Sequence, residues 1–321
     1  MHTILVAGGA GFIGSHLCKE LIKENKIICL DNLITGDDKN IKLLINNPNF
    51  KFIKHDVSKS LREIEKEIKN VTHIFNLASP ASPNKKSPKS YINYPMETLL
   101  ANSFGQYNLL EIAKKMNAEY LYTSTSEVYG NPTVSPQNED YFGNVNPNGI
   151  RSVYDEGKRF GEAMVMTYYR KFNLRVRIIR IFNTYGPFMQ KDDGRVVSNF
   201  INQAIRNEPI TVYGEGKQTR SFCYIDDMIN GLNSAIFSKE AIGKVINLGN
   251  PDERSIFDLA EIVKKITDSS SEIIFENMPE DDPFLRKPDI SRAKKILNWE
   301  PKISIEEGIK KTVEYFKGEL V

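Results

Sequence analysis

The feature that most constrains the fold is a glycine-rich turn close to the N-terminus. Gly8, Gly11 and Gly14 follow directly after an apolar run at residues 4–7 and lead into a helical stretch at residues 15–24. Glycines at this spacing let the backbone turn tightly and leave the N–H groups of the helix N-terminus open to an anion. The pattern predicts a strand–turn–helix unit that binds a phosphate group. A turn that only packs a helix onto a strand is the alternative.

Short apolar runs alternate with helical stretches through the first half of the chain. Such runs are typical of strands buried on both faces of a parallel sheet. Their alternation with helices implies right-handed crossovers and a doubly wound sheet. The sequence therefore predicts an α/β protein with a doubly wound parallel sheet, the Rossmann arrangement, and a smaller C-terminal lobe. The expected strands are residues 4–7, 27–30, 50–53, 73–76, 119–124, 176–181 and 244–248.

The second half of the chain is organised differently. After residue 182, prolines and glycines separate shorter elements, which is typical of a lobe made of loops and short helices. We expect residues 1–181 to form the sheet domain, with the late strand at 244–248 returning to it, and residues 182–321 to form mainly a substrate-binding lobe. Open α/β sheets bind ligands at the carboxyl ends of their strands, so this lobe is expected to close a cleft there.

An acidic residue at the end of the second expected strand indicates which dinucleotide is bound. A carboxylate at Asp31 would accept hydrogen bonds from the adenosine ribose and repel a 2′-phosphate, which predicts NAD rather than NADP. Asn32 and Asp56 are expected near the adenosine, and a strand-end cap is the alternative for Asp56. The glycine turn supplies the rest of this part of the cofactor site: Gly8, Gly11, Phe12, Ile13 and Gly14.

A tyrosine and a lysine provide the candidate catalytic pair. Tyr154 and Lys158 are four residues apart and therefore share one face of a helix. A neighbouring ammonium group and the positive nicotinamide both favour the phenolate, so the pair is suited to take a hydroxyl proton during hydride transfer and to contact NAD. Thr125 and Glu127 follow the fifth strand at the same sheet edge. Thr125 is expected to hydrogen-bond the reacting oxygen, and Glu127 to move protons at a neighbouring carbon; a loop cap is the alternative.

With these residues the chain resembles the extended short-chain dehydrogenases/reductases, and among them it is similar to the UDP-glucuronate decarboxylase (UDP-xylose synthase) family. The resemblance extends over almost the whole chain. Its most specific parts are the ASPASP run and the segment at residues 193–200. The matching segments are residues 8–14, 78–83, 124–130, 154–159, 180–187, 193–200, 212–220 and 286–290.

The resemblance implies an NAD-dependent decarboxylation of UDP-glucuronate to UDP-xylose. Tyr154 would deprotonate the sugar 4-hydroxyl while the C4 hydride passes to NAD⁺, and the resulting ketone would ease loss of the C6 carboxylate as CO₂. Glu127 and Arg220 are implied in reprotonation at C5, before the hydride returns to C4. Tyr213 would lie near the uridine, and the arginines would contact the sugar or diphosphate. The implied substrate-binding residues are Ser126, Asn183, Val197, Tyr213, Arg220 and Arg286.

Two positions depart from the family pattern. The stretch between Pro83 and Pro95 is longer than usual and lies near the sugar C6 end in the family. Phe188 stands where arginine is common. Either change could accompany a different C6 substituent.

The main alternative is a sugar-nucleotide 4,6-dehydratase acting on a UDP- or dTDP-hexose, and a 4-epimerase is the third candidate. A dehydratase typically has an aspartate directly before the glutamate, as an acid for the leaving hydroxyl. Ser126 occupies that position and is a poor acid at neutral pH, which favours decarboxylation. An NAD-binding regulatory protein with an inactive site would be expected to lose Tyr154 or Lys158, and both are present.

The composition limits which further partners, metals and compartments are expected. The formal net charge is +2, which gives no reason to expect nucleic-acid or membrane binding, and no stretch is long and apolar enough to span a bilayer. Four histidines lack metal-ligand spacing, so no metal is expected. Three isolated cysteines indicate a reducing, cytoplasmic compartment. Helices at residues 103–116 and 154–172 are apolar beyond one stripe, and the resemblance implies that they form a homodimer interface.

Overall fold

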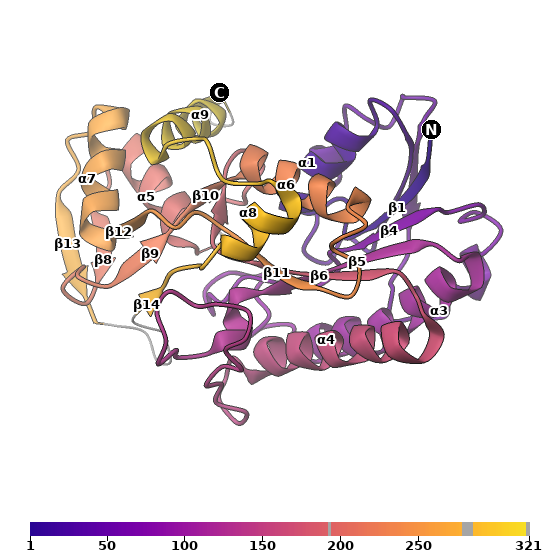
Figure 1. Cartoon of the computed structure of the whole chain (residues 1–321). Coiled ribbons are helices and arrows are strands. Elements are labelled where there is room, and N and C mark those ends of the chain that lie inside the picture. The colour runs from indigo at the N-terminus through magenta and orange to yellow at the C-terminus, as the bar shows by residue number, and fades with distance from the viewer. Residues whose placement is uncertain (192–193, 278–284, 319–321) are drawn as a thin grey trace.

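The seven apolar runs form one parallel sheet in the computed structural model, which describes residues 1–191, 194–277 and 285–318 (Figure 1). The strand order is β11-β6-β5-β4-β1-β2-β3, with every neighbouring pair parallel. The predicted fold class is therefore confirmed. The strands are β1 (Thr3–Ala7), β2 (Lys26–Asp31), β3 (Phe50–Lys54), β4 (His73–Asn76), β5 (Glu119–Thr125), β6 (Val176–Ile181) and β11 (Val245–Leu248).

The order of the strands fixes where a ligand can bind. β1 pairs with β2 on one side and with β4 on the other, so the chain reverses its direction of winding beside β1. Connections on the two sides of this point leave in opposite directions, and a crevice opens outside the carboxyl ends of the strands. The turn after β1 lies at this crevice.

Side chains alternate along β1 between two apolar cores. Val6 packs with Leu17 and other residues on one face, whereas Leu5 packs with Leu109 and Val165 on the other. Figure 1 shows α3 and α4 covering one face, and α1 and α6 lying on the opposite side. The helices are α1 (Phe12–Leu21), α2 (Pro95–Leu100), α3 (Gln106–Met116), α4 (Ser152–Phe172) and α6 (Ile225–Phe237).

The first helix lies three residues earlier than the sequence predicted. It was expected at residues 15–24 and spans Phe12–Leu21, because Gly11 is extended at the N-cap (φ −75°, ψ 177°) and the helix begins with the next residue. The helix expected from residue 103 also begins differently. A π-helical turn, η3 (Ala101–Gly105), joins α2 directly to α3. The N-cap residues of α1 and α3 make no capping side-chain hydrogen bond that would mark them, and the proline of the continuous helix lies at its start in α2, at Pro95.

The C-terminal lobe packs against the sheet domain through a continuous apolar core. Val197, Phe200 and Leu259 belong to the same cluster of buried residues as Leu17 of α1. β9 pairs antiparallel with β12 and parallel with β14, and β13 pairs with β8. The remaining strands are β7 (Thr184–Tyr185), β8 (Ile210–Tyr213), β9 (Thr219–Ser221), β10 (Cys223–Tyr224), β12 (Glu253–Ser255), β13 (Ile273–Glu276) and β14 (Leu285–Arg286). The remaining helices are η1 (Asp38–Ile41), η2 (Leu61–Ile64), η4 (Ser126–Tyr129), α5 (Val196–Ile205), α7 (Ile256–Thr267), α8 (Ser291–Leu297) and α9 (Ile305–Gly318).

A buried histidine at the amino end of β4 makes stability depend on pH. Burial and the neighbouring His2 lower the pKa of His73 from 6.5 to about 4. Between these values the unfolded chain binds a proton that the folded chain does not, so stability falls as the pH falls through this window. We expect His73→Gln to flatten the pH dependence of urea-unfolding free energy between pH 6.5 and 4.5. Equal slopes for variant and wild type would contradict this assignment.

Candidate active site

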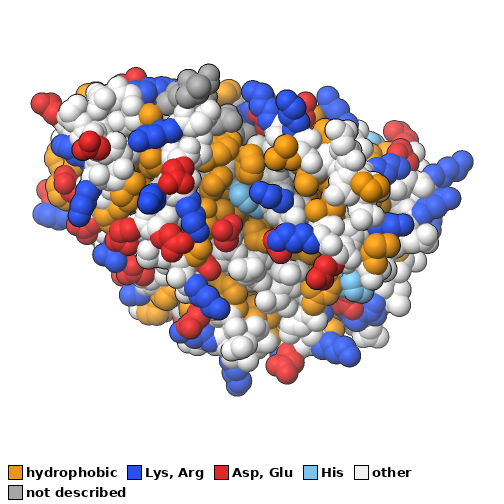
Figure 2. All heavy atoms as spheres, turned by 90° about the horizontal axis from the view of Figure 1, so that it is seen from above, with side chains coloured by type: hydrophobic (Ala, Val, Ile, Leu, Met, Phe, Trp, Pro, Cys, Tyr) orange, Lys and Arg blue, Asp and Glu red, His pale blue; other side chains and the backbone are white. Residues whose placement is uncertain are grey.

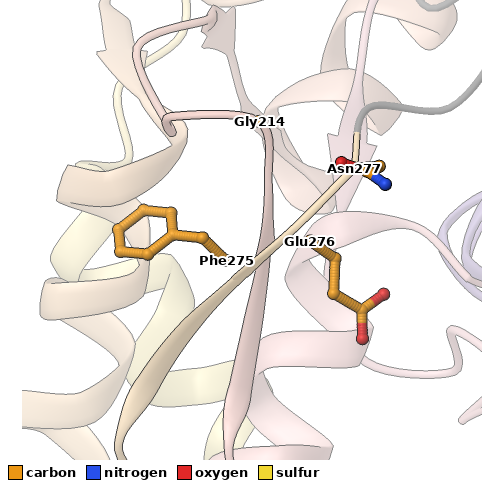
Figure 3. A pocket seen from close by; sticks show the side chains of 4 residues that line it. All are labelled: Gly214, Phe275, Glu276 and Asn277. Carbon is orange, nitrogen blue, oxygen red and sulfur yellow. The ribbon is translucent and has the colours of Figure 1, made fainter.

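A cleft of about 1000 Å³ lies between the carboxyl edge of the sheet and the C-terminal lobe. A smaller open hollow shares lining residues with it, and in Figure 3 Phe275 and Glu276 point to opposite sides of β13. Glu276 also lines the large cleft. The cleft, not the hollow, brings together most residues predicted from the sequence: Gly8, Gly11, Phe12, Ile13, Gly14, Thr125, Ser126, Glu127, Tyr154, Lys158, Asn183, Val197, Tyr213, Arg220 and Arg286.

The glycine turn forms a cradle that side chains would fill. A Cβ atom on Gly14 would lie 2.1 Å from the carbonyl oxygen of Gly8, and Gly8 itself has φ +79°. Gly11 caps α1 without a side-chain hydrogen bond, and the first turn of α1 carries no acidic residue. Backbone N–H groups at this helix end are therefore available to a diphosphate. These residues fit a dinucleotide.

The acidic residues predicted to contact adenosine lie beside the turn rather than among the residues that line the cleft. The carboxylate of Asp31 accepts hydrogen bonds from the N–H groups of Ala10 (3.0 Å) and Leu33 (2.8 Å), and burial raises its pKa. Asn32 donates to Asp56 at 3.2 Å. Asp56 also accepts from the backbone and hydroxyl of Ser58, which is the cap expected as its alternative role. Their contacts with NAD stay predictions.

The tyrosine–lysine pair lies on the first turns of α4, below the end of β5. Tyr154 is 7% exposed, and the Lys158 ammonium nitrogen lies 5.7 Å from the centre of its ring. Lys158 donates a hydrogen bond to the carbonyl oxygen of Thr123 at 2.9 Å. Thr125 hydrogen-bonds to Tyr154, and its hydroxyl accepts from the N–H of Glu127 at 3.2 Å. Thr125 thus caps η4 and fixes both reactive groups.

The pKa values of this pair differ from what the spacing predicted. Burial and the Glu127 carboxylate raise the pKa of Tyr154, while Thr125 opposes the shift. Burial lowers the pKa of Lys158 to about 7, although Glu162 favours its charged form. Spacing along a helix shows which groups are neighbours but not how deeply they are buried. Tyr154 therefore needs further positive charge beside it to become a base, and the nicotinamide of NAD⁺ carries one.

Glu127 is the centre of a buried charged cluster. Its carboxylate lies 2.8 Å from a guanidinium nitrogen of Arg151 and 3.6 Å from one of Arg286, and it accepts a hydrogen bond from Tyr91 at 3.3 Å. Burial alone would raise the pKa of Glu127, but Arg151, Arg286 and a hydrogen bond with Asp155 hold it well below its usual range. The carboxylate is therefore ionised and held by three separate segments of the chain.

Two positive side chains lie side by side where the C-terminal lobe borders the cleft. Arg220 of β9 and Arg286 of β14 are partners in the register of the two strands, and both line the cleft. Adjacent guanidinium groups suit a diphosphate because each makes paired charge-assisted hydrogen bonds. Arg286 also reaches Glu127, a contact that its predicted role as a substrate ligand did not include.

Sequence reasoning missed Tyr91 and Arg151. The Tyr91 ring stacks on Tyr154 with centroids 4.9 Å apart and planes 2° from parallel. Arg151 precedes Tyr154 by three residues, so its helical spacing could have identified it. Tyr91 belongs to the lengthened stretch between Pro83 and Pro95, where no periodic pattern marks a single position.

The two departures from the family pattern have different places in the structure. Phe188 packs between the rings of His16 and Tyr315, each about 5.1 Å away, and is not among the residues lining the cleft. The lengthened stretch does line it, through Lys85, Lys86 and Lys89 among others. Of the segment at residues 193–200, Asp193 lies outside the described residues.

Comparison with known proteins identifies the class and then the group. The chain belongs to the NAD dependent epimerase/dehydratase family, whose model matches residues 4–249. Within it, the chain groups with the UDP-glucuronic acid decarboxylases. It is 50% identical to UDP-glucuronic acid decarboxylase 1 of Arabidopsis thaliana over 319 residues, 99% of this chain and 70% of that relative. Identity to UDP-glucuronic acid decarboxylase 1 of Xenopus tropicalis is 46%, over 99% of this chain and 72% of that one.

A solved structure extends the comparison to a bound site. UDP-glucuronic acid 4-epimerase from Bacillus cereus, in complex with UDP-glucuronic acid and NAD, has a TM-score of 0.87 and 30% identity over 99% of each chain. The cofactor predicted from the glycine turn and Asp31 is confirmed by the family: the protein is NAD-dependent.

Outside the cleft, the surface carries charges of both signs. Figure 2 shows basic and acidic side chains interspersed over the face seen from above. Among the described residues, no group of three or more His, Cys, Asp or Glu side chains is placed to hold a metal ion. None of the helices described is long and apolar enough to cross a membrane.

The glycine turn gives a direct test of the cofactor site. We expect Gly14→Ala to weaken NAD binding at least tenfold, because its methyl group would collide with the Gly8 carbonyl and displace the turn. Isothermal titration calorimetry measures the affinity. Gly318→Ala is the matched control, since a Cβ there meets nothing within 4 Å. Unchanged NAD affinity in Gly14→Ala would place the dinucleotide elsewhere.

Proposed function

We propose that this protein decarboxylates UDP-glucuronate to UDP-xylose in the cleft, through a 4-keto intermediate. Its relatives at 46–50% identity over nearly the whole chain are UDP-glucuronic acid decarboxylases. The observation in the site that carries the proposal is the buried Glu127, ionised between two guanidinium groups and next to Tyr154. In this arrangement Glu127 would exchange a proton with a ring carbon, C5, and Tyr154 would act as the base for the hydroxyl group on the neighbouring carbon, C4.

Several residues have separate roles in the oxidation and reduction of C4. The dinucleotide that the glycine turn would hold would supply reversible hydride transfer: a hydride would leave C4 at the start of the cycle and return to C4 at its end. The phenol oxygen of Tyr154 takes the proton of the 4-hydroxyl and later gives it back. Thr125 orients that oxygen, and Lys158, held by the Thr123 carbonyl, stabilises the negative charge that forms on it. Gly8, Gly11 and Gly14 shape the turn that holds the diphosphate.

The ketone at C4 makes the next bond easy to break. It is β to the C6 carboxylate, so loss of CO₂ leaves the electron pair delocalised as an enolate. Glu127 lines the cleft, and we assign it, together with Arg220, to the protonation of C5. Arg286 beside Glu127 would stabilise the enolate charge. Arg220 and Asn183 are assigned to the sugar or diphosphate, Tyr213 to the uridine. Ser126 and Val197 complete the lining.

The dehydratase alternative differs at one position. That reaction needs an acid to protonate the departing C6 hydroxyl, and the residue before Glu127 is the buried Ser126. A serine hydroxyl does not supply this proton at neutral pH. The site therefore favours loss of CO₂ over loss of water.

Product analysis tests the function. Purified protein with NAD⁺ and UDP-glucuronate should release CO₂ and yield UDP-xylose, identified by mass spectrometry and NMR. Tyr154→Phe removes only the phenol oxygen and should lower kcat by roughly 10²-fold or more. UDP-glucose and UDP-N-acetylglucosamine serve as control substrates. Loss of water from either of them, without CO₂ release from the acid, would assign the protein to the dehydratases.

We also propose that the protein is a homodimer through the outer face of α2, η3, α3 and α4. Part of the apolar surface of α4 is used inside the protein, since Tyr168 is buried and Met164, Met166 and Tyr169 pack against the core. The exposed apolar side chains on this face are instead Met96, Leu99, Phe104, Tyr107, Phe160 and Phe172. A cluster of this kind on neighbouring helices is typical of a protein interface. The cytoplasmic location remains a proposal, based on three buried cysteines that form no disulfide.

Charge substitution tests the interface. Phe104 is 60% exposed and Phe160 is 52% exposed, so Glu at either position should not disturb the core but should oppose pairing of two apolar faces. We expect Phe104→Glu with Phe160→Glu to shift the mass measured by light scattering from dimer to monomer. Phe275→Glu, at a 56% exposed site on β13, is the matched control. A wild-type protein that is already monomeric would exclude the proposal.

A further inference from the structure

Behind Glu127 lies a second buried carboxyl group with no role in the steps above. Asp155 follows Tyr154 on α4 and is 7% exposed. Its side chain hydrogen-bonds to Glu127, while its Oδ1 has no hydrogen-bond partner among the described residues. A hydrogen bond between two carboxyl groups requires a proton on one of them. The two side chains therefore form a pair that holds one proton.

The surroundings of the pair determine where that proton resides. Arg151, Arg286 and the Tyr91 hydroxyl all contact Glu127 through its two oxygens. Burial and the charge of Glu127 raise the pKa of Asp155, and the two arginines only partly oppose this. Two carboxylates in contact at a buried site do not both ionise at neutral pH. The ground state is thus a carboxylic acid at Asp155 and a carboxylate at Glu127.

The proposed reaction needs such a proton. Tyr154 takes one from the 4-hydroxyl and returns the same one at the end of the cycle. Decarboxylation replaces the C5–C6 bond by a C5–H bond, so each turnover consumes one additional proton. That proton must come from a group at C5 that carries it when the enolate forms. Glu127 alone, ionised between two guanidinium groups, does not carry it.

We propose that the Asp155–Glu127 pair stores the proton that is delivered to C5, with Glu127 facing the sugar and Asp155 acting as a positioning residue behind it. This inference rests on the proposed function. As CO₂ leaves, the electron pair of the C5–C6 bond enters the enolate; it then forms the C5–H bond with the proton of the pair. The pair is left with two negative charges, balanced by Arg151 and Arg286, and regains a proton from water.

Asp155→Asn tests the proposal. An amide of the same size still donates a hydrogen bond to Glu127 but stores no transferable proton. We expect kcat at pH 7 to fall roughly 100-fold while KM for UDP-glucuronate changes less than threefold. The variant's kcat should then rise as the pH is lowered, because Glu127 itself must be protonated. The wild-type kcat should instead be level near neutrality and fall at alkaline pH, where the pair loses its proton.

Two further variants separate proton storage from structure. Asp155→Glu restores a carboxyl group and should recover part of kcat and the wild-type pH profile. Glu156→Gln is the matched control, since the neighbouring Glu156 pairs with Arg159 rather than with Glu127, and it should behave as wild type. NAD binding and thermal unfolding report whether each variant is folded. Should Asp155→Asn not fold, the wild-type profile decides, and a kcat that stays level through alkaline pH overturns the proposal.

The experiments distinguish a failure of the proposed function from a failure of the stored-proton proposal. Wild-type protein that releases no CO₂ from UDP-glucuronate defeats the proposed function. An active wild type with an Asp155→Asn variant that keeps its kcat and its pH profile defeats only the stored proton.

Discussion

The active site depends on how one buried carboxylate is neutralised. Glu127 could not remain ionised at its depth without positive partners, and it recruits them from two places: Arg151 before α4 and Arg286 in the C-terminal lobe. Removing one partner of a buried ion pair costs about 3–5 kcal/mol, because the remaining charge stays desolvated. The contact with Arg286 therefore does more than lower the pKa of Glu127. It ties the end of β5 to the opposite wall of the cleft, so the position of the lobe and the ionisation of Glu127 are coupled.

Burial also makes the ionisation of Tyr154 dependent on the cofactor. Burial raises the pKa of Tyr154 and lowers that of Lys158 to about 7, so the site without a further cation favours the neutral phenol. Glu127 adds to this by repelling a phenolate. Positive charge on the nicotinamide acts against both effects. In the proposed mechanism, Tyr154 therefore takes the proton of the substrate hydroxyl only when the oxidant is bound, so that proton transfer and oxidation occur together.

Local patterns in the sequence predicted the sheet and much of the lining of the cleft. Apolar runs identify buried strands, and glycines such as Gly14 identify a turn where no Cβ fits, since both depend on near neighbours. Helix ends were less accurate: α1 begins at Phe12 because Gly11 caps it without a side chain. The pairing of Asp155 with Glu127 could not be predicted, because it joins segments 28 positions apart and depends on burial that no spacing encodes.

The stretch before α2, which we expect to be longer than in the family, is compatible with the contacts of the site. Tyr91 within it stacks on Tyr154 and donates a hydrogen bond to Glu127, so one side chain contacts both groups. The N–H of Tyr91 donates a hydrogen bond to the carbonyl oxygen of Ser82 at 3.0 Å, so the residues between them form a closed loop. Additional residues inside a closed loop cost little, since closure entropy grows slowly with length. This loop can therefore add lysines along the cleft while Tyr91 keeps its contacts. A longer loop is thus compatible with the proposed reaction at C4 and C5.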